Sequence, residues 1–244
     1  MIEKIKKCAV EWSLLGVTIG ILSLWTYQRN TLWNSELELW KDCARKSPRK
    51  ERIYSHLGFI YVESGQLDEA EKILQKALTL NPRYAPALYN MGLIRYKKGQ
   101  IDEAIDLYRR AFELDPLFSE PVYNIGIAYF HKGQYGEAVE AYKKFLDLRP
   151  DYENGHNSLG LAYGALKDWD NAIKAFQEEL RYHPDNFYAH LYLGLAYKET
   201  EDYLMALAHL KKMLAHPNIP NAEWVKKAIS SIEAVVKKDE KAGN

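Results

Sequence analysis

The sequence predicts an all-α solenoid, a stack of helix pairs repeated along the chain, and three ladders of residues support this prediction. Prolines, glycines and alanines each recur at intervals of 34 residues through the middle of the 244-residue chain. The ladders are Pro48, Pro82, Pro116, Pro150 and Pro184; Gly58, Gly92, Gly126, Gly160 and Gly194; and Ala70, Ala104, Ala138, Ala172 and Ala206. Because all three share one pitch, we number positions 1 to 34 within each repeat, starting at Glu51.

Each ladder has a physical reason within a helix pair. Glycine at position 8 and alanine at position 20 let two helix backbones approach, where overfilling typically costs about 1–3 kcal/mol. Proline at position 32 cannot continue a helix and therefore ends the second helix of each pair. Apolar residues recur between these anchors at helical spacing, and Gly65, Gly99 and Gly133 mark the turns between paired helices.

The stretch LGFIYVESGQLDEAEKILQKALTLNP, residues 57–82, closely resembles the tetratricopeptide repeat. The resemblance implies a right-handed superhelix of helix pairs with a concave groove. It predicts five repeats over residues 51–220, at 51–84, 85–118, 119–152, 153–186 and 187–220. Arg95 departs from the motif at an aromatic position, and Lys167 and Glu201 replace the turn glycine of the last two repeats.

Both ends of the array require caps, because terminal repeats have no neighbour to cover them. Residues 30–50 read as a degenerate half repeat, with Trp40 at position 24 and Pro48 at position 32. Residues 221–244 read as a capping helix and tail. We expect Trp224, Ala228, Ile232 and Val235 to share its packing face.

Residues 1–29 read as a short tail and a single transmembrane anchor. Residues 12–27 carry no charge, and residues 8–27 as a helix would span about 30 Å, the thickness of a bilayer core. Lys4, Lys6 and Lys7 precede the segment and only Arg29 follows closely, so the N-terminus is expected in the cytoplasm and the repeats in the periplasm or another extracytoplasmic space. A cleaved signal peptide and a buried soluble helix are the alternatives; no small-residue cleavage site follows the apolar run.

The junction TYQRNTLWNSELELWKDCARKSP resembles the one between the last membrane helix and the repeats of O-mannosyltransferase-like membrane proteins. Those proteins carry their repeats on the extracytoplasmic side. The resemblance implies this topology, and no transferase activity is carried over from it.

In tetratricopeptide proteins the first helix of each pair lines the groove, with positions 2, 5, 9, 12 and 13 pointing into it. Here these positions form an apolar and aromatic strip with amides beside it, which suits an extended peptide or a helix of a partner protein. The residues predicted to line the groove are Phe59, Val62, Tyr89, Asn90, Leu93, Tyr96, Lys97, Tyr123, Asn124, Ile127, Phe130, His131, Asn157, Leu161 and Leu195. The alternative is that position 9, Tyr89, Tyr123 and the asparagines pack between repeats. The clamp that grips a terminal carboxylate in some family members is only partly present, so that specificity is not predicted.

No catalytic signature accompanies the repeats. The sequence holds no Walker-type loop, HExxH, CxxC or GxSxG motif, and His156 and His190 both fall at a packing position. Lys plus Arg and Asp plus Glu both number 33, so nothing indicates a nucleic-acid partner. We therefore predict a membrane-anchored scaffold with no enzymatic activity, cofactor, metal or small-molecule substrate. The alternatives are an accessory subunit of a membrane glycosyltransferase or envelope-assembly enzyme, and a soluble co-chaperone.

Overall fold

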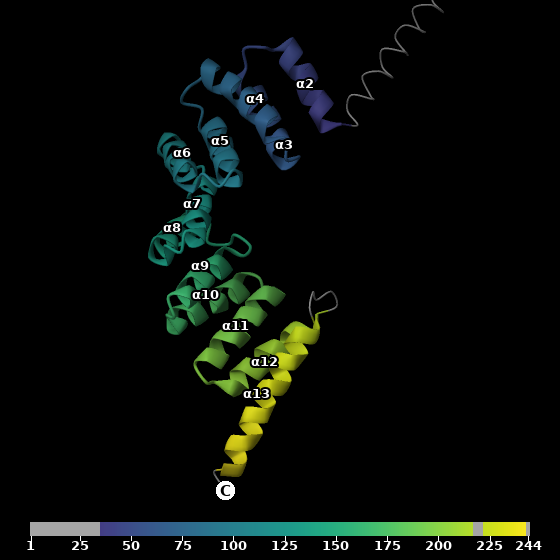
Figure 1. The fold of residues 1–244 in the computed structure, drawn as a ribbon, viewed down its shortest axis with the longest axis vertical. Helices are drawn as coiled ribbons and strands as arrows, with labels where there is room; N and C mark the ends of the chain where they lie inside the picture. Colours follow the sequence, from purple (N-terminus) through teal and green to yellow (C-terminus); the bar gives the residue numbers. More distant parts are fainter. Residues whose placement is uncertain (1–34, 217–221, 243–244) are drawn as a thin grey trace, which may run out of the picture. The chain divides into compact units, whose positions relative to one another are not determined.

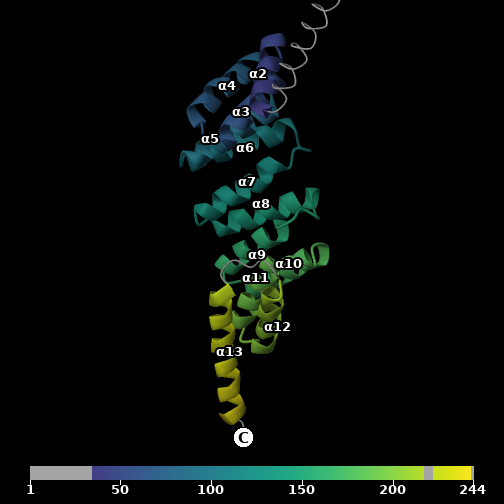
Figure 2. The same ribbon diagram turned by 90° about the vertical axis from the view of Figure 1, so that its right-hand side faces the viewer.

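The computed structural model describes residues 35–216 and 222–242, and all regular structure within these ranges is helical. A short helix, α2 (Glu36–Lys46), precedes five helix pairs, and α13 (Ala222–Ala242) follows them (Figures 1 and 2). The first helices of the pairs are α3 (Glu51–Glu63), α5 (Ala85–Lys97), α7 (Glu120–His131), α9 (Gly155–Ala165) and α11 (Phe187–Glu199). The second helices are α4 (Leu67–Leu80), α6 (Ile101–Leu114), α8 (Tyr135–Leu148), α10 (Trp169–Tyr182) and α12 (Tyr203–Leu214). The predicted all-α solenoid of helix pairs is confirmed.

The chain forms two compact units, which divide within α5 between Ile94 and Arg95. In the first unit α2 packs on α3 and α3 packs on α4. In the second unit successive helices from α6 to α13 pack on one another, and the first helices α9 and α11 are also in contact.

The glycine ladder has the role that its spacing predicts. A methyl group on Gly58 would lie 2.4 Å from the Leu74 side chain, and one on Gly160 would lie 2.4 Å from the Phe176 ring. Gly126 and Gly194 face Tyr142 and Leu210 in the same way, at 2.6 Å. Position 8 therefore receives the large side chain of position 24 from the partner helix. The position-20 alanines are completely buried in every repeat.

Each turn between paired helices needs one residue in the left-handed backbone conformation, and that residue need not be glycine. Gly65, Gly99 and Gly133 have φ between 74° and 78°. Lys167 and Glu201 occupy the same place in the last two repeats with φ of 60° and 62°. Their side chains make this conformation cost about 1–2 kcal/mol. Replacing the turn glycine has therefore changed the energy of the turn and has kept its shape.

The C-terminal helix α13 covers α12 with part of the predicted face: Ile232 is buried and Ala228 packs against the same cluster, as predicted. Val225, Ile229 and Ile232 are buried against Leu210 and Met213. Trp224 is 50% exposed and Val235 is 38% exposed, so their assignment to the packing face was wrong. The buried stripe runs at intervals of four and three residues from Val225, one residue along from the predicted start.

None of the helices in the two described ranges has both the length and the apolar character required to cross a bilayer. The predicted tail and anchor, residues 1–29, lie outside the described residues.

Candidate functional site on the first-helix face

The predicted groove residues of the first unit divide into surface and interior residues. Phe59 is 38% exposed, and Tyr89 and Leu93 are half-buried. Val62 is completely buried, and Asn90 is 5% exposed. The prediction that these last two line an open groove is therefore corrected.

Asn90 instead joins two first helices. Its Nδ2 donates to the backbone carbonyl of Ser55 at 3.0 Å and to the Ser55 hydroxyl at 3.3 Å. A buried amide must find hydrogen-bond partners. Asn90 therefore packs between the two helices and holds α5 against α3.

In the second unit the predicted residues of α7 form an aromatic surface. The Tyr123 hydroxyl lies 2.9 Å from the Ser158 hydroxyl on α9, and burial raises the pKa of Tyr123. Ile127 and Phe130 are partly buried against the core. Asn124 is partly buried and donates to the Glu120 carbonyl, which is local bonding within α7.

At the start of this unit, the Tyr96 hydroxyl lies 2.8 Å from His131 Nδ1. The predicted residues Lys97 and His131 are exposed. Burial of the Tyr96 ring raises its pKa, so the hydroxyl stays protonated near neutral pH and can donate to the imidazole.

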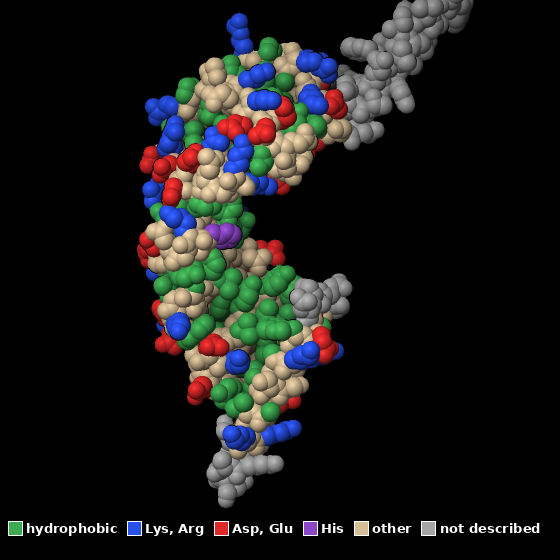
Figure 3. All heavy atoms as spheres, in the orientation of Figure 1, with side chains coloured by type: hydrophobic (Ala, Val, Ile, Leu, Met, Phe, Trp, Pro, Cys, Tyr) green, Lys and Arg blue, Asp and Glu red, His purple; other side chains and the backbone are tan. Residues whose placement is uncertain are grey.

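Farther along, Leu161 and Leu195 lie where the prediction placed them, beside a hollow between α9 and α11. This hollow has a volume of about 320 Å³. Figure 3 shows hydrophobic side chains gathered over α9 and α11 in the second unit. The hollow is lined by Gly160, Leu161, Gly164, Ala165, Trp169, Phe176, Tyr192, Leu195, Ala196 and Glu199. We call it the apolar pocket.

Two further hollows are connected to it through shared lining residues. Leu161 and Tyr192 also line a polar hollow of about 230 Å³, together with Asn154, Asn157, Ser158 and Tyr188. Asn154 and Tyr188 in turn line a third hollow of about 520 Å³ with Glu153, Tyr182, His183, Pro184, Asp185, Asn186, Phe187 and His216. Because adjacent hollows share residues, we treat the three as one trough. The sequence prediction missed most of its lining.

A break in the repeat pattern creates the apolar pocket. Position 12 is Tyr96 in the second repeat and Phe130 in the third, but it is Gly164 in the fourth. The next residue, Ala165, is also small and is exposed. The hole lies where the two preceding repeats carry an aromatic ring, with Trp169 as one wall, whereas the first and fifth repeats carry Val62 and Lys198 there. Glycine at a position that is aromatic in the two preceding repeats was the available sequence signal.

Asn157 lies inside the trough wall, not on its surface. It is 3% exposed, so its assignment to an open groove surface is corrected. Its Nδ2 donates to Asn154 Oδ1 at 2.9 Å, whereas its Oδ1 is buried and has no hydrogen-bond partner among the described residues.

Beneath the trough a buried carboxylate organises the start of α9. Glu179 of α10 is completely buried. Its Oε1 accepts from the Asn154 N–H at 2.8 Å and from Asn186 Nδ2 at 3.0 Å. Its Oε2 accepts from the N–H groups of His156 and Asn157 at 3.2 and 3.4 Å. The three backbone N–H groups are otherwise unbonded donors at a helix N-terminus, where negative charge is favoured.

Sequence reasoning missed Glu179, although its position carries a signal. Position 27 is Ala77, Ala111, Phe145 and Met213 in the other repeats, and all four are buried. A single carboxylate at a position that is buried in every repeat indicates a specific hydrogen-bonding partner.

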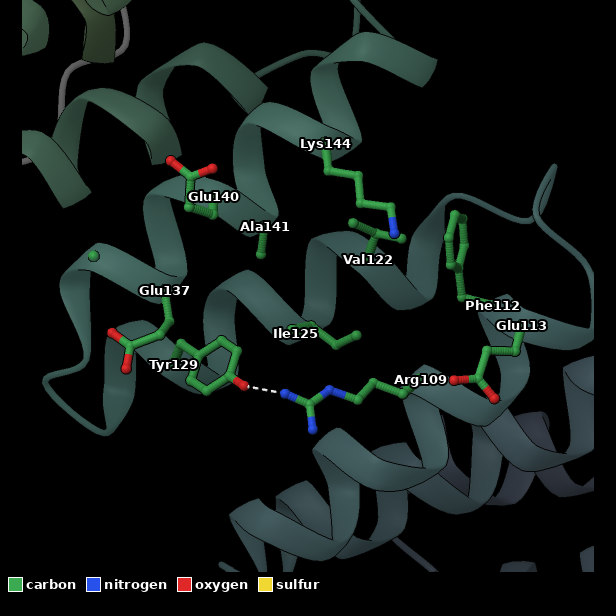
Figure 4. A pocket seen from close by; sticks show the side chains of 11 residues that line it. Arg109, Phe112, Glu113, Val122, Ile125, Tyr129, Glu137, Glu140, Ala141 and Lys144 are labelled. Atoms are coloured by element: carbon green, nitrogen blue, oxygen red, sulfur yellow. Dashed lines mark hydrogen bonds between the residues drawn. The ribbon is translucent and has the colours of Figure 1, made fainter.

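A larger hollow lies between α6, α7 and α8, and it also escaped prediction. It has a volume of about 650 Å³ and a floor that includes Phe112, Val122 and Ile125 (Figure 4). Its two cations already have contacts: Arg109 donates to the Tyr129 hydroxyl, and Lys144 Nζ lies 4.3 Å from the Phe112 ring centre. Both cations on its rim thus contact other residues of the same hollow. We therefore take the trough as the candidate site.

Two histidines, His190 of α11 and His209 of α12, lie in contact between these helices. His190 Nδ1 and His209 Nδ1 lie 3.0 Å apart, a distance that requires one ring to donate and the other to accept. Burial lowers the pKa of both rings. Burial, with smaller contributions from His190 and Lys212, lowers the pKa of His209 from 6.5 to about 4. For His190, Asp185 acts against burial, in the direction that raises the pKa.

We expect the second unit to lose stability as the pH falls from 6.5 toward 4. The unfolded chain takes up the proton first, because the folded pKa of His209 is the lower one. Since the ring is only about half buried, the expected loss is about 1 kcal/mol. Urea unfolding across this window measures it. H209N should flatten the dependence, and an equal slope in H209N would contradict the assignment.

Among the described residues, no three or more His, Cys, Asp or Glu side chains gather in a way that could hold a metal ion. The expected absence of a metal stays a prediction.

The comparisons with known proteins agree with this architecture. Family models of the tetratricopeptide repeat match residues 49–116, 107–140 and 157–223, and a model described as TPR repeat matches residues 126–167. Together they span residues 49–223. No curated protein matches the chain in sequence.

Several solved structures share the fold. The crystal structure of MamA is 26% identical, with a TM-score of 0.60 over 65% of this chain and 93% of that one. YrrB, described as a TPR protein with an unusual peptide-binding site, is 20% identical, with a TM-score of 0.63 over 78% of this chain and 99% of that one. PilF of Pseudomonas aeruginosa is 19% identical, with a TM-score of 0.63 over 77% and 90%. The ladders, the helix pairs and the matching family models together show that the chain belongs to the tetratricopeptide repeat family.

Proposed function

We propose that this protein is a scaffold that binds a protein or peptide partner in the trough on the first-helix face of its second unit. The observation that carries the proposal is the trough itself. An apolar pocket adjoins a polar hollow on one continuous face, and this combination suits a peptide, whose side chains and backbone differ in polarity. The fold relative YrrB, described as having a peptide-binding site, supports the same use of the fold.

We further propose that residues 8–27 anchor the chain in a membrane, with the N-terminus in the cytoplasm and the repeats on the extracytoplasmic or periplasmic side. The apolar run and the lysines before it support this topology. Carbonate extraction and protease protection of the native protein test it. A chain that stays in the soluble fraction would instead favour the co-chaperone alternative.

We propose no enzymatic activity, because the trough contains no arrangement of nucleophile and base. A second candidate function is an accessory subunit of a membrane glycosyltransferase or envelope-assembly enzyme, favoured by the resemblance of the junction at residues 26–48. Both functions use the trough, and the identity of the captured partner separates them.

The test of the scaffold function compares partner capture by the native chain and by a double variant, L161D with L195D. Both side chains line the apolar pocket, and adding carboxylates there should reduce capture at least about tenfold, since a charge cannot be buried cheaply in an apolar site. Capture is measured by cross-linking in membranes, purification and mass spectrometry.

The matched control is L204D, because Leu204 is 73% exposed on α12 and lies outside the trough. Circular dichroism should show equal helical content in all three proteins. Partners retained by L161D with L195D would exclude the trough as the binding surface.

A further inference from the structure

We propose that the trough selects an extended peptide that carries one bulky apolar side chain flanked by lysine or arginine. The apolar side chain enters the pocket between α9 and α11, and the adjoining peptide backbone lies along the polar hollow. The inference rests on the proposed function and deepens it by naming the class of ligand. Three separate features of the trough carry it.

The first feature is the size and lining of the apolar pocket. Its volume of about 320 Å³ accommodates one large side chain, and its walls are apolar except for Glu199. The hole exists because Gly164 stands where Phe130 stands in the preceding repeat. A ligand side chain of similar kind therefore replaces the missing ring.

The second feature is the polar hollow beside the apolar pocket. The two hollows share Leu161 and Tyr192, and Asn154 and Ser158 supply polar groups to the second one. An extended peptide presents an apolar side chain and polar backbone groups within one or two residues, so one ligand segment fits both hollows.

The third feature is the charge along the trough. Glu199 lies at the apolar end, and Glu153 and Asp185 lie at the other. No lysine or arginine lines any of the three hollows, and none of the three carboxylates forms an ion pair within the described residues. Cationic flanks on the ligand complement this charge, whereas an acidic peptide is repelled.

The experiment uses the purified full-length chain and short fluorescent peptides that differ at one central residue, either Phe, Leu or Ser, with flanks of Lys or of Glu. Fluorescence anisotropy gives the affinities. We expect Phe or Leu to bind at least about tenfold more tightly than Ser, because the side chain leaves water for an apolar pocket. Lys flanks should bind more tightly than Glu flanks, by a margin that shrinks as salt is added.

Three further measurements assign the contacts. G164F and A165F should each bring the affinity of the Phe peptide down to that of the Ser peptide, by filling the pocket from two adjacent positions. A208F, at an exposed α12 position outside the trough, should leave the affinity unchanged.

Equal affinities for the Phe and Ser peptides, tighter binding of the Glu-flanked set, or self-association of the chain with no binding of any peptide would each overturn the inference. These outcomes are distinct from failure of the scaffold function. If L161D with L195D loses its native partner while the peptides show no preference, only the ligand class falls. If that variant keeps its partner, both proposals fall.

Discussion

Replacing Glu179 with alanine should destabilise the second unit by about 3–5 kcal/mol, the largest of the effects that we predict for this protein. The carboxylate is completely buried and accepts hydrogen bonds from three backbone N–H groups at the start of α9 and from the Asn186 amide. Removing it leaves the three backbone donors without an acceptor, and a buried donor without a partner costs about 1–3 kcal/mol. The Asn186 amide keeps its bond to Asn154 Oδ1. The truncation also leaves a cavity between α9 and α10.

The effect should be local before it is global. Repeat arrays lose stability one repeat at a time, because each repeat contacts only its neighbours. Hydrogen exchange should therefore speed up first in α9, whose N-terminal amides the carboxylate holds, and in the Asn154 turn, where φ is 64°. Urea unfolding followed by circular dichroism gives the total loss of stability.

The neighbouring residue supplies a matched control. Glu178 is partly exposed and pairs with Arg181 at 2.7 Å on the surface, so E178A should cost less than about 1 kcal/mol. E179Q keeps the shape of the side chain but turns an NH₂ group toward backbone donors, so its stability should fall between those of the native chain and E179A. An E179A protein as stable as E178A would refute the anchoring role.

Replacing Gly160 with alanine should also destabilise the second unit, by about 1–3 kcal/mol. The added methyl group would lie 2.4 Å from Cε1 of Phe176, closer than atoms can approach, so α9 and α10 must separate or the ring must leave its rotamer. Because Phe176 is 3% exposed and packs among Ala172, Leu193 and Ala196, it has little room to move. Denaturant unfolding of G160A measures the cost.

The same substitution at another helical glycine should have the opposite sign. Gly136 lies on α8, and a methyl group there meets no atom within 4 Å. G136A should therefore stabilise the protein by about 0.5–1 kcal/mol, because alanine loses less backbone entropy than glycine on forming a helix. The difference in unfolding free energy between G160A and G136A separates the cost of the helix contact at Gly160 from the effect of helix propensity. Equal effects of the two substitutions would show that the glycine ladder does not mark the close approach of paired helices.

Much of the architecture was predictable because repetition turns weak local signals into a strong one. A single glycine or proline says little, whereas five at a constant interval give both the helix pairs and their crossing point. The contacts from Gly58, Gly126, Gly160 and Gly194 to position 24 follow this prediction. The face of α13 was predicted less well, because α13 lies outside the ladder and only its own periodicity could orient it.

The candidate site was predictable only in part, because the family pattern gives positions and does not give exposure. Leu161 and Leu195 line the trough as expected. Val62, Asn90 and Asn157 stand at repeat positions that line the groove in the family, yet neighbouring helices bury them. No local sequence pattern indicates how closely those helices approach. The features that shape the trough and its support, Gly164 and Glu179, depart from the residues at the same positions of the other repeats.

By itself the sequence determined the all-α class, the repeat length, the place of each helix pair and the apolar run at residues 12–27, since these depend on the order of residues along the chain. The tertiary structure alone decided which groove residues are open, where the trough lies and which donors meet Glu179. Those outcomes depend on residues 22 to 32 positions apart that come within hydrogen-bonding distance, and on space left empty where a side chain is absent. Distance through space is set by packing between helices, which the periodicity of any one helix does not contain.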